Sequence, residues 1–405
     1  MKLPIYMDYH ATTPVDPGVV DAMLPYFNEK FGNPASRQHR FGWVTEEAVE
    51  SSRKTLASLI GAQSKEIIFT SGATESNNLA LKGIAEACGN PSLREKQKGD
   101  HIVTVQTEHK SILDTCQKLS KGGFQITYLP VDRDGIVDRE HLEKAITNKT
   151  ILVSIMIANN EIGTIQYVED IGNICRARGV FFHTDATQAI GKIPVDVETM
   201  KVDLMSFTGH KIYGPKGVGA LYVRSSNPRV KIALQMEGGG HERGMRSGTL
   251  NVPGIVGLAK ACELSVQLMP EESKRLTSFR ETMFTAFTSK LDDVYLNGHP
   301  TRRLPSNLNV SFNHVEDNAL MMSMKDIAVS TGSACSTSDP EPSHVLKALR
   351  LPSERLHSSI RFGLGRFTTE EEVDYVINRV VENVIKLRKL SPSYKSSKEV
   401  VLSSS

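Results

Sequence analysis

Short apolar runs alternate with amphipathic stretches between about residues 60 and 224. Short β-branched and aromatic runs bounded by turn residues indicate strands, and longer stretches with a helical period indicate helices. Strands are predicted at residues 66–70, 101–106, 124–129, 151–157, 180–184, 204–208 and 218–223. Helices are predicted between them at residues 74–88, 111–119, 139–146 and 168–178. This alternation is typical of βαβ units, so we predict an α/β domain with a mainly parallel, seven-stranded sheet.

The pattern changes after a glycine-rich segment at residues 238–248. A long charged helical stretch is followed by shorter elements that indicate a smaller α+β domain. We predict helices at 255–291, 317–325, 343–349 and 370–387, and strands at 307–312 and 358–363. The expected organisation is a large domain at 15–260, a small domain from 1–14 and 261–390, and a mobile serine-rich tail at 391–405.

Length and composition indicate an ordinary globular protein of roughly two to three domains. Its 48 Lys and Arg against 46 Asp and Glu leave a net charge of +2, which gives no reason to expect nucleic acid or an anionic membrane as a partner. The longest apolar run, residues 151–158, is too short to span a bilayer, and Asp8 interrupts the N-terminus before a leader develops. Five scattered cysteines without a C-x-x-C pair favour a reducing compartment. We therefore expect a cytoplasmic protein with a small ligand.

The residues that follow the predicted strands carry the candidate chemistry, because open α/β sheets bind ligands at the carboxyl ends of their strands. The small-residue segment SGATES at 71–76 leads from a strand into a helix and offers N–H groups to a phosphate. A plain helix N-cap is the alternative. His109 follows the next strand and is either a catalytic group or a structural histidine. Asp185 ends another strand, where it either pairs with a cationic ring nitrogen or caps a helix.

Lys211 follows the strand at 204–208 and lies among small residues. A lysine at the end of a core strand is poorly explained as a surface charge, and desolvation makes it a candidate Schiff-base nucleophile. A Walker A loop is excluded, because Pro215 stands where its lysine must be. A phosphate cradle, a histidine, a carboxylate and a Schiff-base lysine together indicate pyridoxal phosphate chemistry.

Two residues of the predicted small domain are further candidates. Cys335 lies in the small-residue run STGSACSTS at 330–338, which we expect to be mobile and exposed, so its thiol is a candidate nucleophile. An incidental surface cysteine is the alternative. Arg361 alternates with apolar neighbours on a predicted strand and is either a clamp for a substrate carboxylate or a structural ion-pair partner.

Long motifs over nearly all of residues 1–390 resemble the cysteine desulfurases of the iron-sulfur-cluster assembly type. They are MKLPIYMD (1–8), DYHATTP (8–14), FGNPAS (31–36), SGATESN (71–77), NNEIG (159–163), HTDATQ (183–188), GHKIYGPKG (209–217) and RSGT (246–249). The resemblance implies a homodimer with the fold type I of pyridoxal phosphate enzymes, which takes sulfur from L-cysteine and releases L-alanine.

The resemblance also implies roles for individual residues. Lys211 resembles the cofactor-linked lysine, Asp185 the partner of the ring nitrogen and His109 the stacking acid and base. Gln188 and Asn160 are implied to contact the ring. The phosphate contacts are implied for Ala73, Thr74, Thr208 and His210, with Thr249 from the other subunit. The implied substrate contacts are Arg361 and Asn33.

Cys335 would become the persulfide that passes sulfur to an iron-sulfur scaffold protein and other acceptors, with tRNA thiolation served through relay proteins. It is also a candidate transient ligand of a [2Fe-2S] cluster shared with that scaffold. Many relatives end in a Trp-containing motif, whereas Trp43 is the only Trp here, which leaves scaffold docking at the C-terminus open. Thr208 stands where many relatives have Ser, and the Cys335 segment begins STG. The alternatives are a selenocysteine lyase or another class V lyase or aminotransferase, and an inactive interaction subunit.

Overall fold

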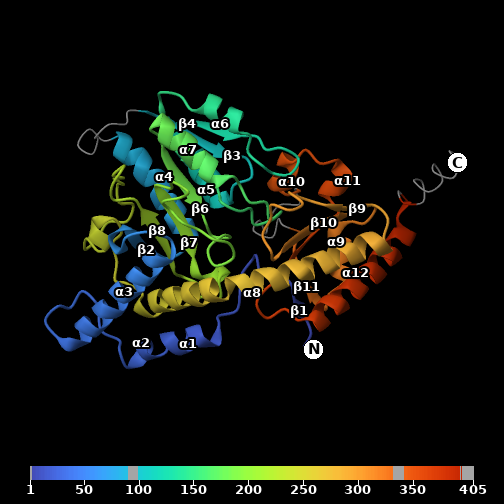
Figure 1. Ribbon diagram of the computed structural model, residues 1–405, viewed down its shortest axis with the longest axis horizontal. Helices are drawn as coiled ribbons and strands as arrows, with labels where there is room; N and C mark the ends of the chain where they lie inside the picture. The colour runs from blue at the N-terminus through green and yellow to red at the C-terminus, as the bar shows by residue number, and fades with distance from the viewer. Residues whose placement is uncertain (1, 90–98, 332–341, 393, 395–405) are drawn as a thin grey trace.

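The central element is a seven-stranded sheet (Figure 1). The structure, a computed structural model, describes residues 2–89, 99–331, 342–392 and 394. The strands, in order across the sheet, are β2 (Ile67–Thr70), β8 (Gly219–Val223), β7 (Leu204–Thr208), β6 (Phe181–Asp185), β5 (Thr150–Ser154), β3 (His101–Val105) and β4 (Gln125–Leu129). Only β8 runs antiparallel to its neighbours within this sheet, so the predicted mainly parallel α/β sheet is confirmed.

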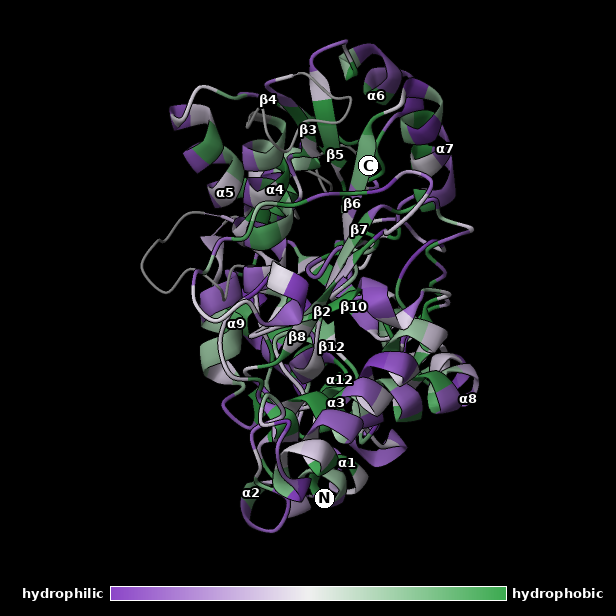
Figure 2. Ribbon diagram, turned by 90° about the vertical axis from the view of Figure 1, so that its left-hand side faces the viewer, coloured by the Kyte–Doolittle hydropathy of each residue, from purple (hydrophilic) through white to green (hydrophobic). Residues whose placement is uncertain are grey.

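Helices cover both faces of this sheet, which explains why its strands are almost continuously apolar. Ile68 packs towards the face covered by α4 (Ala73–Gly89) and α5 (Lys110–Lys121), whereas Ile67 and Phe69 pack towards the opposite face. The opposite face is covered by α3 (Arg40–Leu59), α6 (Arg139–Ala145), α7 (Val168–Arg178) and the first part of α8 (Val252–Lys290). Figure 2 shows mainly hydrophobic strands inside and helices of mixed polarity, such as α6 and α7, outside.

A second core forms around a three-stranded antiparallel sheet. Its elements are β9 (Val294–Leu296), β10 (Asn307–Phe312) and β12 (Ser359–Gly363), the pair β1 (Ile5–Tyr6) and β11 (Ile327–Ala328), and the helices α9 (Asp317–Ser323) and α12 (Glu370–Leu390). The short helix α11 (Ser353–Leu356) packs its Leu356 against the first core. The described residues also form α1 (Pro17–Met23), α2 (Pro25–Asn28) and α10 (His344–Ala348), of which α10 packs on the first core.

Helix α8 joins the two cores in one continuous helix (Figure 1). Its first turns, through Cys262, belong to the first core, and Leu276, Met283 and Phe287 belong to the second. An 18-residue window of α8 has a mean hydropathy of 1.2, enough by length and composition to cross a membrane, but half of that window is buried inside the protein, as in a core helix. The passage of α8 between the cores supports our proposed domain boundary near residue 260.

Candidate active site

A cavity of about 570 Å³ opens at the carboxyl ends of the parallel strands. This volume lies within the range of small-molecule and cofactor sites. The N-terminal segment at His10–Thr12 and Arg361 of β12 complete its wall. The cavity brings together the predicted site residues Ala73, Thr74, His109, Asn160, Asp185, Gln188, Thr208, His210, Lys211 and Arg361.

Asp185 is the last residue of β6, and its carboxylate is held on both oxygens. Oδ2 accepts a hydrogen bond of 2.8 Å from the Asn77 side chain, and Oδ1 accepts one of 2.9 Å from the Thr187 N–H. Both sequence interpretations therefore have a basis, because Asp185 caps the turn after β6 and also faces the cavity. Asn77 of α4 was not predicted as a site residue, and only its place one turn into the helix after SGATES could have indicated it.

Glu108 lies fully buried beside Asp185. Burial, reinforced by the negative charge of Asp185, raises the pKa of Glu108 well above its ordinary value. Its Oε1 accepts a hydrogen bond of 2.6 Å from the Met156 N–H. Glu108 and Asp185 thus place two carboxyl groups close together at this end of the cavity.

His109 is the N-cap residue of α5 and also lines the cavity. Its Nδ1 accepts a hydrogen bond of 3.1 Å from the Ser111 N–H. A ring nitrogen that accepts from an N–H carries no proton, so a neutral His109 has its proton on Nε2. The structural interpretation of His109 as a helix cap and its interpretation as a site residue therefore both apply.

Lys211 lies in the short 3₁₀ turn that follows β7. Its Nζ donates to the carbonyl oxygens of His10, at 2.7 Å, and Ala11, at 2.5 Å. These bonds bring the N-terminal segment against the strand ends and hold the amine at the cavity wall. Sequence spacing alone could not place residues 10 and 211 in contact.

The first turn of α4 supplies the anion-binding end of the cavity, since Ala73 and Thr74 line it and a helix N-terminus attracts anions. Glu75 in this turn accepts a 2.7 Å hydrogen bond from the Ser71 N–H. His210 lies at the same end, where burial and the charge of Lys211 lower its pKa to about 4. The His210 ring is therefore neutral, and the positive charge at this end of the cavity is on the lysines.

The Thr208 hydroxyl lines the same cavity and donates to the Val218 carbonyl oxygen at 3.0 Å. That bond uses the only proton of the hydroxyl and leaves its lone pairs. A phosphate contact from Thr208 therefore requires the hydroxyl to rotate away from Val218.

Arg361 is 3% exposed, and its guanidinium is bound on two sides. Nη2 forms an ion pair of 2.6 Å with Asp8, and Nη1 donates to the Asn160 carbonyl oxygen at 3.0 Å. Nε is buried and has no hydrogen-bond partner among the described residues. The predicted structural ion pair thus exists, and the same side chain lines the cavity. Asp8, which was not predicted as a site residue, is the residue that orients it.

Three predicted site residues lie elsewhere. Asn33 is exposed, its Oδ1 accepts from the Ala35 N–H at 2.9 Å, and it does not line the cavity. Thr249 is also exposed in this single chain, and the resemblance assigns it to the cavity of a second subunit. Cys335 lies outside the described residues, which end at Thr331 and resume at residue 342.

Comparison with known proteins assigns the family. Residues 5–376 match the model of the class-V aminotransferases. The chain is 56% identical over 401 residues, covering 99% of this chain and 97% of the relative, to a protein of Anaeromyxobacter sp. (strain Fw109-5) named cysteine desulfurase IscS. A solved structure of a NifS-like protein superposes with a TM-score of 0.85 at 39% identity, covering 93% of this chain and 98% of that one. Another, described as SspA in complex with cysteine, superposes with a TM-score of 0.77 at 35% identity, covering 90% and 100%.

The fold and the cavity at its strand ends are thus those of a class-V aminotransferase, a family of pyridoxal phosphate enzymes. The identity to the IscS relatives is high and spans almost the whole of both chains. Within the class-V family the chain therefore belongs to the cysteine desulfurases.

Proposed function

We propose that the chain converts L-cysteine to L-alanine with pyridoxal phosphate as its cofactor and retains the sulfur as a persulfide on Cys335. The observation that carries the proposal is the convergence of Lys211, Asp185, His109 and Arg361 on one cavity from four different elements. An amine, a fixed carboxylate, a histidine and a carboxylate clamp are the groups that this chemistry needs.

The described residues fit the cofactor. The cavity has an end lined by the α4 N-terminus, which suits a phosphate, and an end with a fixed carboxylate, which suits a protonated ring nitrogen. The Thr187 hydroxyl is buried in the cavity wall without a hydrogen-bond partner among the described residues, and buried polar atoms are normally satisfied. A polar ligand in the cavity would supply such a partner.

Pyridoxal phosphate, when bound, supplies an aldehyde that condenses with amines and a ring that accepts the electrons released at the substrate Cα. We assign Lys211 as the residue that holds the cofactor and then moves the Cα proton. Asp185, fixed by Asn77 and Thr187, keeps the ring nitrogen protonated. His109, which lines the cavity, would lie against the bound ring, and its Nε2–H would be available to the reacting atoms.

Further contacts complete the proposed cofactor site. Ala73, Thr74, Thr208 and His210 bind the phosphate, and Asn160 and Gln188 contact the ring. Thr249 of a second subunit joins the phosphate site, so the active form is a homodimer.

Arg361 and Cys335 handle the substrate. The Arg361 guanidinium, held by Asp8, binds the carboxylate of L-cysteine, and Nε offers an unused N–H for it. Asn33, which does not line the cavity, is a further proposed contact of the substrate. The Cys335 thiolate attacks the substrate sulfur, the Cβ–S bond breaks, and its electron pair stays on the three-carbon product, which is protonated to alanine.

The persulfide sulfur leaves Cys335 for acceptor proteins. We propose an iron-sulfur scaffold protein as one acceptor, with relay proteins for tRNA thiolation as others. Cys335 is a transient ligand when a [2Fe-2S] cluster forms on that scaffold. A near-neutral charge and cysteines without a C-x-x-C pair support a cytoplasmic location.

The test uses the purified protein, loaded with pyridoxal phosphate and incubated with ³⁴S-labelled L-cysteine. We expect one alanine released for each sulfur transferred, and peptide mass mapping should find the label on Cys335. Cys335→Ser should keep the visible cofactor absorbance and form no labelled persulfide. Cys175→Ala, which changes a buried cysteine of α7, is the matched control and should behave as the wild type. Continued sulfur transfer by Cys335→Ser would contradict the proposal.

A further inference from the structure

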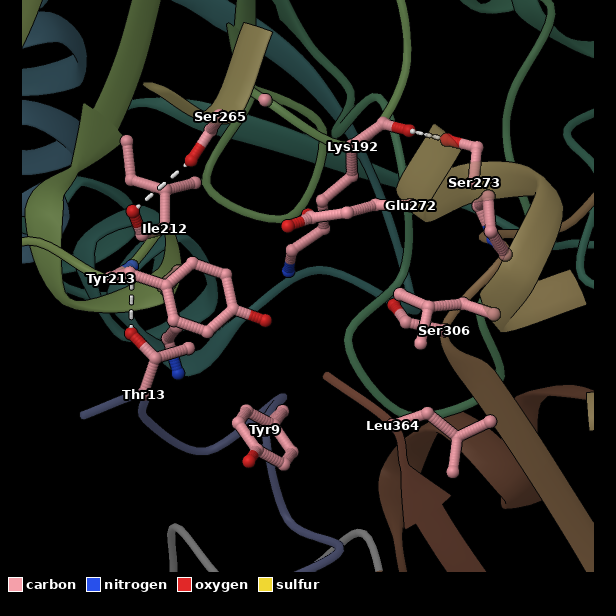
Figure 3. Close-up of a pocket in the computed structure, with 14 residues that line it drawn as sticks. Tyr9, Thr13, Lys192, Ile212, Tyr213, Ser265, Glu272, Ser273, Ser306 and Leu364 are labelled. Carbon is pink, nitrogen blue, oxygen red and sulfur yellow. Dashed lines mark hydrogen bonds between the residues drawn. The ribbon is translucent and has the colours of Figure 1, made fainter. Parts of the chain in front are cut away.

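A second, small cavity is shown in Figure 3. It shares the lining residue Lys211 with the large cavity. Its volume is about 30 Å³, room for one or two water molecules. Lys192 extends into it, and the cavity is also lined by Tyr213, Glu272 and Lys211. Helix α8 holds the Lys192 backbone in place, because the Ser273 hydroxyl donates to its carbonyl oxygen at 3.2 Å. The known chemistry of the site gives this half-buried lysine no role.

Lys192 contacts the active-site residue Gln188. Its Nζ donates to Gln188 Oε1 at 2.6 Å, across one turn of the chain. The other end of the amide, Nε2, donates to the His10 carbonyl oxygen at 3.0 Å. That is the same carbonyl to which Lys211 donates. Lys192, Gln188, His10 and Lys211 therefore form one continuous hydrogen-bonded chain behind the cofactor cavity.

The Lys192 ammonium and the His10 carbonyl oxygen favour the same orientation of the Gln188 amide. An ammonium has three donors and no acceptor, so it tolerates only the oxygen of an amide at 2.6 Å. The alternative orientation would set the amide NH₂ against the Lys192 ammonium and the amide oxygen against the His10 carbonyl oxygen.

The His10 ring does not make this choice, although the His10 carbonyl oxygen favours the amide NH₂. Burial, with the charges of Lys192 and Arg361, lowers the pKa of His10 well below its ordinary value, so the ring is neutral and has one N–H. Nε2 lies 3.2 Å from the Ser306 carbonyl oxygen, and Nδ1 lies 3.0 Å from Gln188 Oε1. If the proton goes to Ser306, the bare Nδ1 favours the amide NH₂ instead of the oxygen. The ring thus accommodates either orientation of Gln188.

We propose that Lys192 is a positioning residue, which fixes the Gln188 amide so that Nε2 faces the cofactor cavity as a donor and Oε1 faces away from it. Nε2 has two N–H groups and one partner among the described residues, so one N–H remains for the ring oxygen of the cofactor. The inference rests on the proposed function, because only a bound cofactor makes the orientation matter. Without Lys192, the His10 carbonyl oxygen alone would favour this orientation, so the amide would present its oxygen to that ring oxygen more often.

The experiment is best done near pH 6. Burial, with the charges of Lys211 and Arg361, lowers the pKa of Lys192 to about 7, so the ammonium form predominates there. The other charged or titratable groups that face this lysine are His10, Tyr9, Tyr213 and Glu272. A fixed pH keeps the protonation of these groups constant across the variants.

The variants are Lys192→Met, Lys192→Arg, Gln188→Ala and the double variant Lys192→Met with Gln188→Ala. The readouts are the dissociation constant for pyridoxal phosphate and the position of the visible absorbance band, with circular dichroism as a check of the fold. Lys192→Met should weaken cofactor binding by about tenfold, the equivalent of about 1.4 kcal/mol, and shift the band. Lys192→Arg, which keeps a donor-only cation, should restore both. Lys260→Met, which removes an exposed ion pair of α8, is the matched control and should change neither.

The double variant separates positioning from a merely structural role. If Lys192 acts through Gln188, the double variant binds the cofactor as Gln188→Ala does. A further tenfold loss in the double variant, or an unchanged band and affinity in Lys192→Met, would overturn the inference while leaving the proposed function intact. A wild-type protein that binds no pyridoxal phosphate would overturn the proposed function itself.

Discussion

Glu161 makes the stability of this protein depend on pH in an unusual direction. Its carboxyl is 4% exposed and accepts a hydrogen bond from the Ser343 hydroxyl. Burial raises the pKa of Glu161 from 4.5 to about 7, against the lowering influence of Ser343 and of the charge on Arg361. The folded protein therefore keeps a proton on Glu161 at pH values where the unfolded chain has released it.

The sign and size of this pH dependence of stability follow from proton linkage. Since the folded state binds more protons than the unfolded state between pH 4.5 and about 7, the free energy of unfolding falls as the pH rises through this window. The Glu161 contribution is fully present below the unfolded pKa and is lost above the folded one. This rise in the pKa of Glu161 corresponds to about 3 kcal/mol in the free energy of unfolding. About 2.5 kcal/mol of this contribution is lost between pH 5 and pH 8.

Glu161→Gln removes the titration and keeps a neutral side chain that can still accept from Ser343. We expect the stability of this variant relative to the wild type to increase by about 2.5 kcal/mol from pH 5 to pH 8. Urea unfolding at both pH values measures this difference. Glu140→Gln, at an 82% exposed position of α6, is the control and should show no such trend. A constant difference between Glu161→Gln and the wild type would refute the reasoning.

Three further changes test the cavity. Asn77→Ala removes the 2.8 Å hydrogen bond to the buried Asp185 carboxylate, and should lower the free energy of unfolding by about 1.5–3 kcal/mol in urea titrations. Arg361→Lys loses the planar fork and should raise KM for L-cysteine by about tenfold or more in an alanine-release assay, with little effect on cofactor absorbance. Glu108→Gln should retain most of its activity and stability at pH 7, because burial and the charge of Asp185 favour the neutral form of Glu108.

Each of these expectations has a contradicting result. An unchanged unfolding midpoint for Asn77→Ala would mean that its bond to Asp185 adds nothing. A normal KM for Arg361→Lys would remove Arg361 from the substrate site. A strong loss of activity in Glu108→Gln would show that the carboxyl works in its charged form.

The elements with strong hydrophobic periodicity could be predicted from the sequence. All seven strands of the large sheet and the helices between them lie within a few residues of their expected positions. β5 ends at Ser154, before the expected residue 157. The N–H groups of Ile155 and Ile157 still donate to carbonyl oxygens of β6, but the backbone there no longer has regular strand geometry. Helix α3 was not predicted, since its buried positions include Gly42, Thr45, Ser52 and Arg53, which give no apolar stripe. The two-residue strands β1 and β11 are too short to carry a pattern.

The part of the candidate site that lies at the strand ends could be predicted from the sequence. Residues that follow β2, β3, β6 and β7 were found because the ends of parallel strands meet at one edge. The contact of Arg361 with Asp8, and that of Lys211 with His10, join segments hundreds of positions apart, which only the packing of the N-terminal segment creates. The sequence did not indicate a role for Lys192, since a lysine after a glycine is typical of a solvent-exposed turn.

The cavity at the strand ends is tested most directly by borohydride reduction of the protein loaded with pyridoxal phosphate, followed by proteolysis and peptide mass mapping. We predict a single pyridoxyl adduct on the peptide that contains Lys211. An adduct on another lysine, such as Lys192, or no adduct at all, would contradict the assignment.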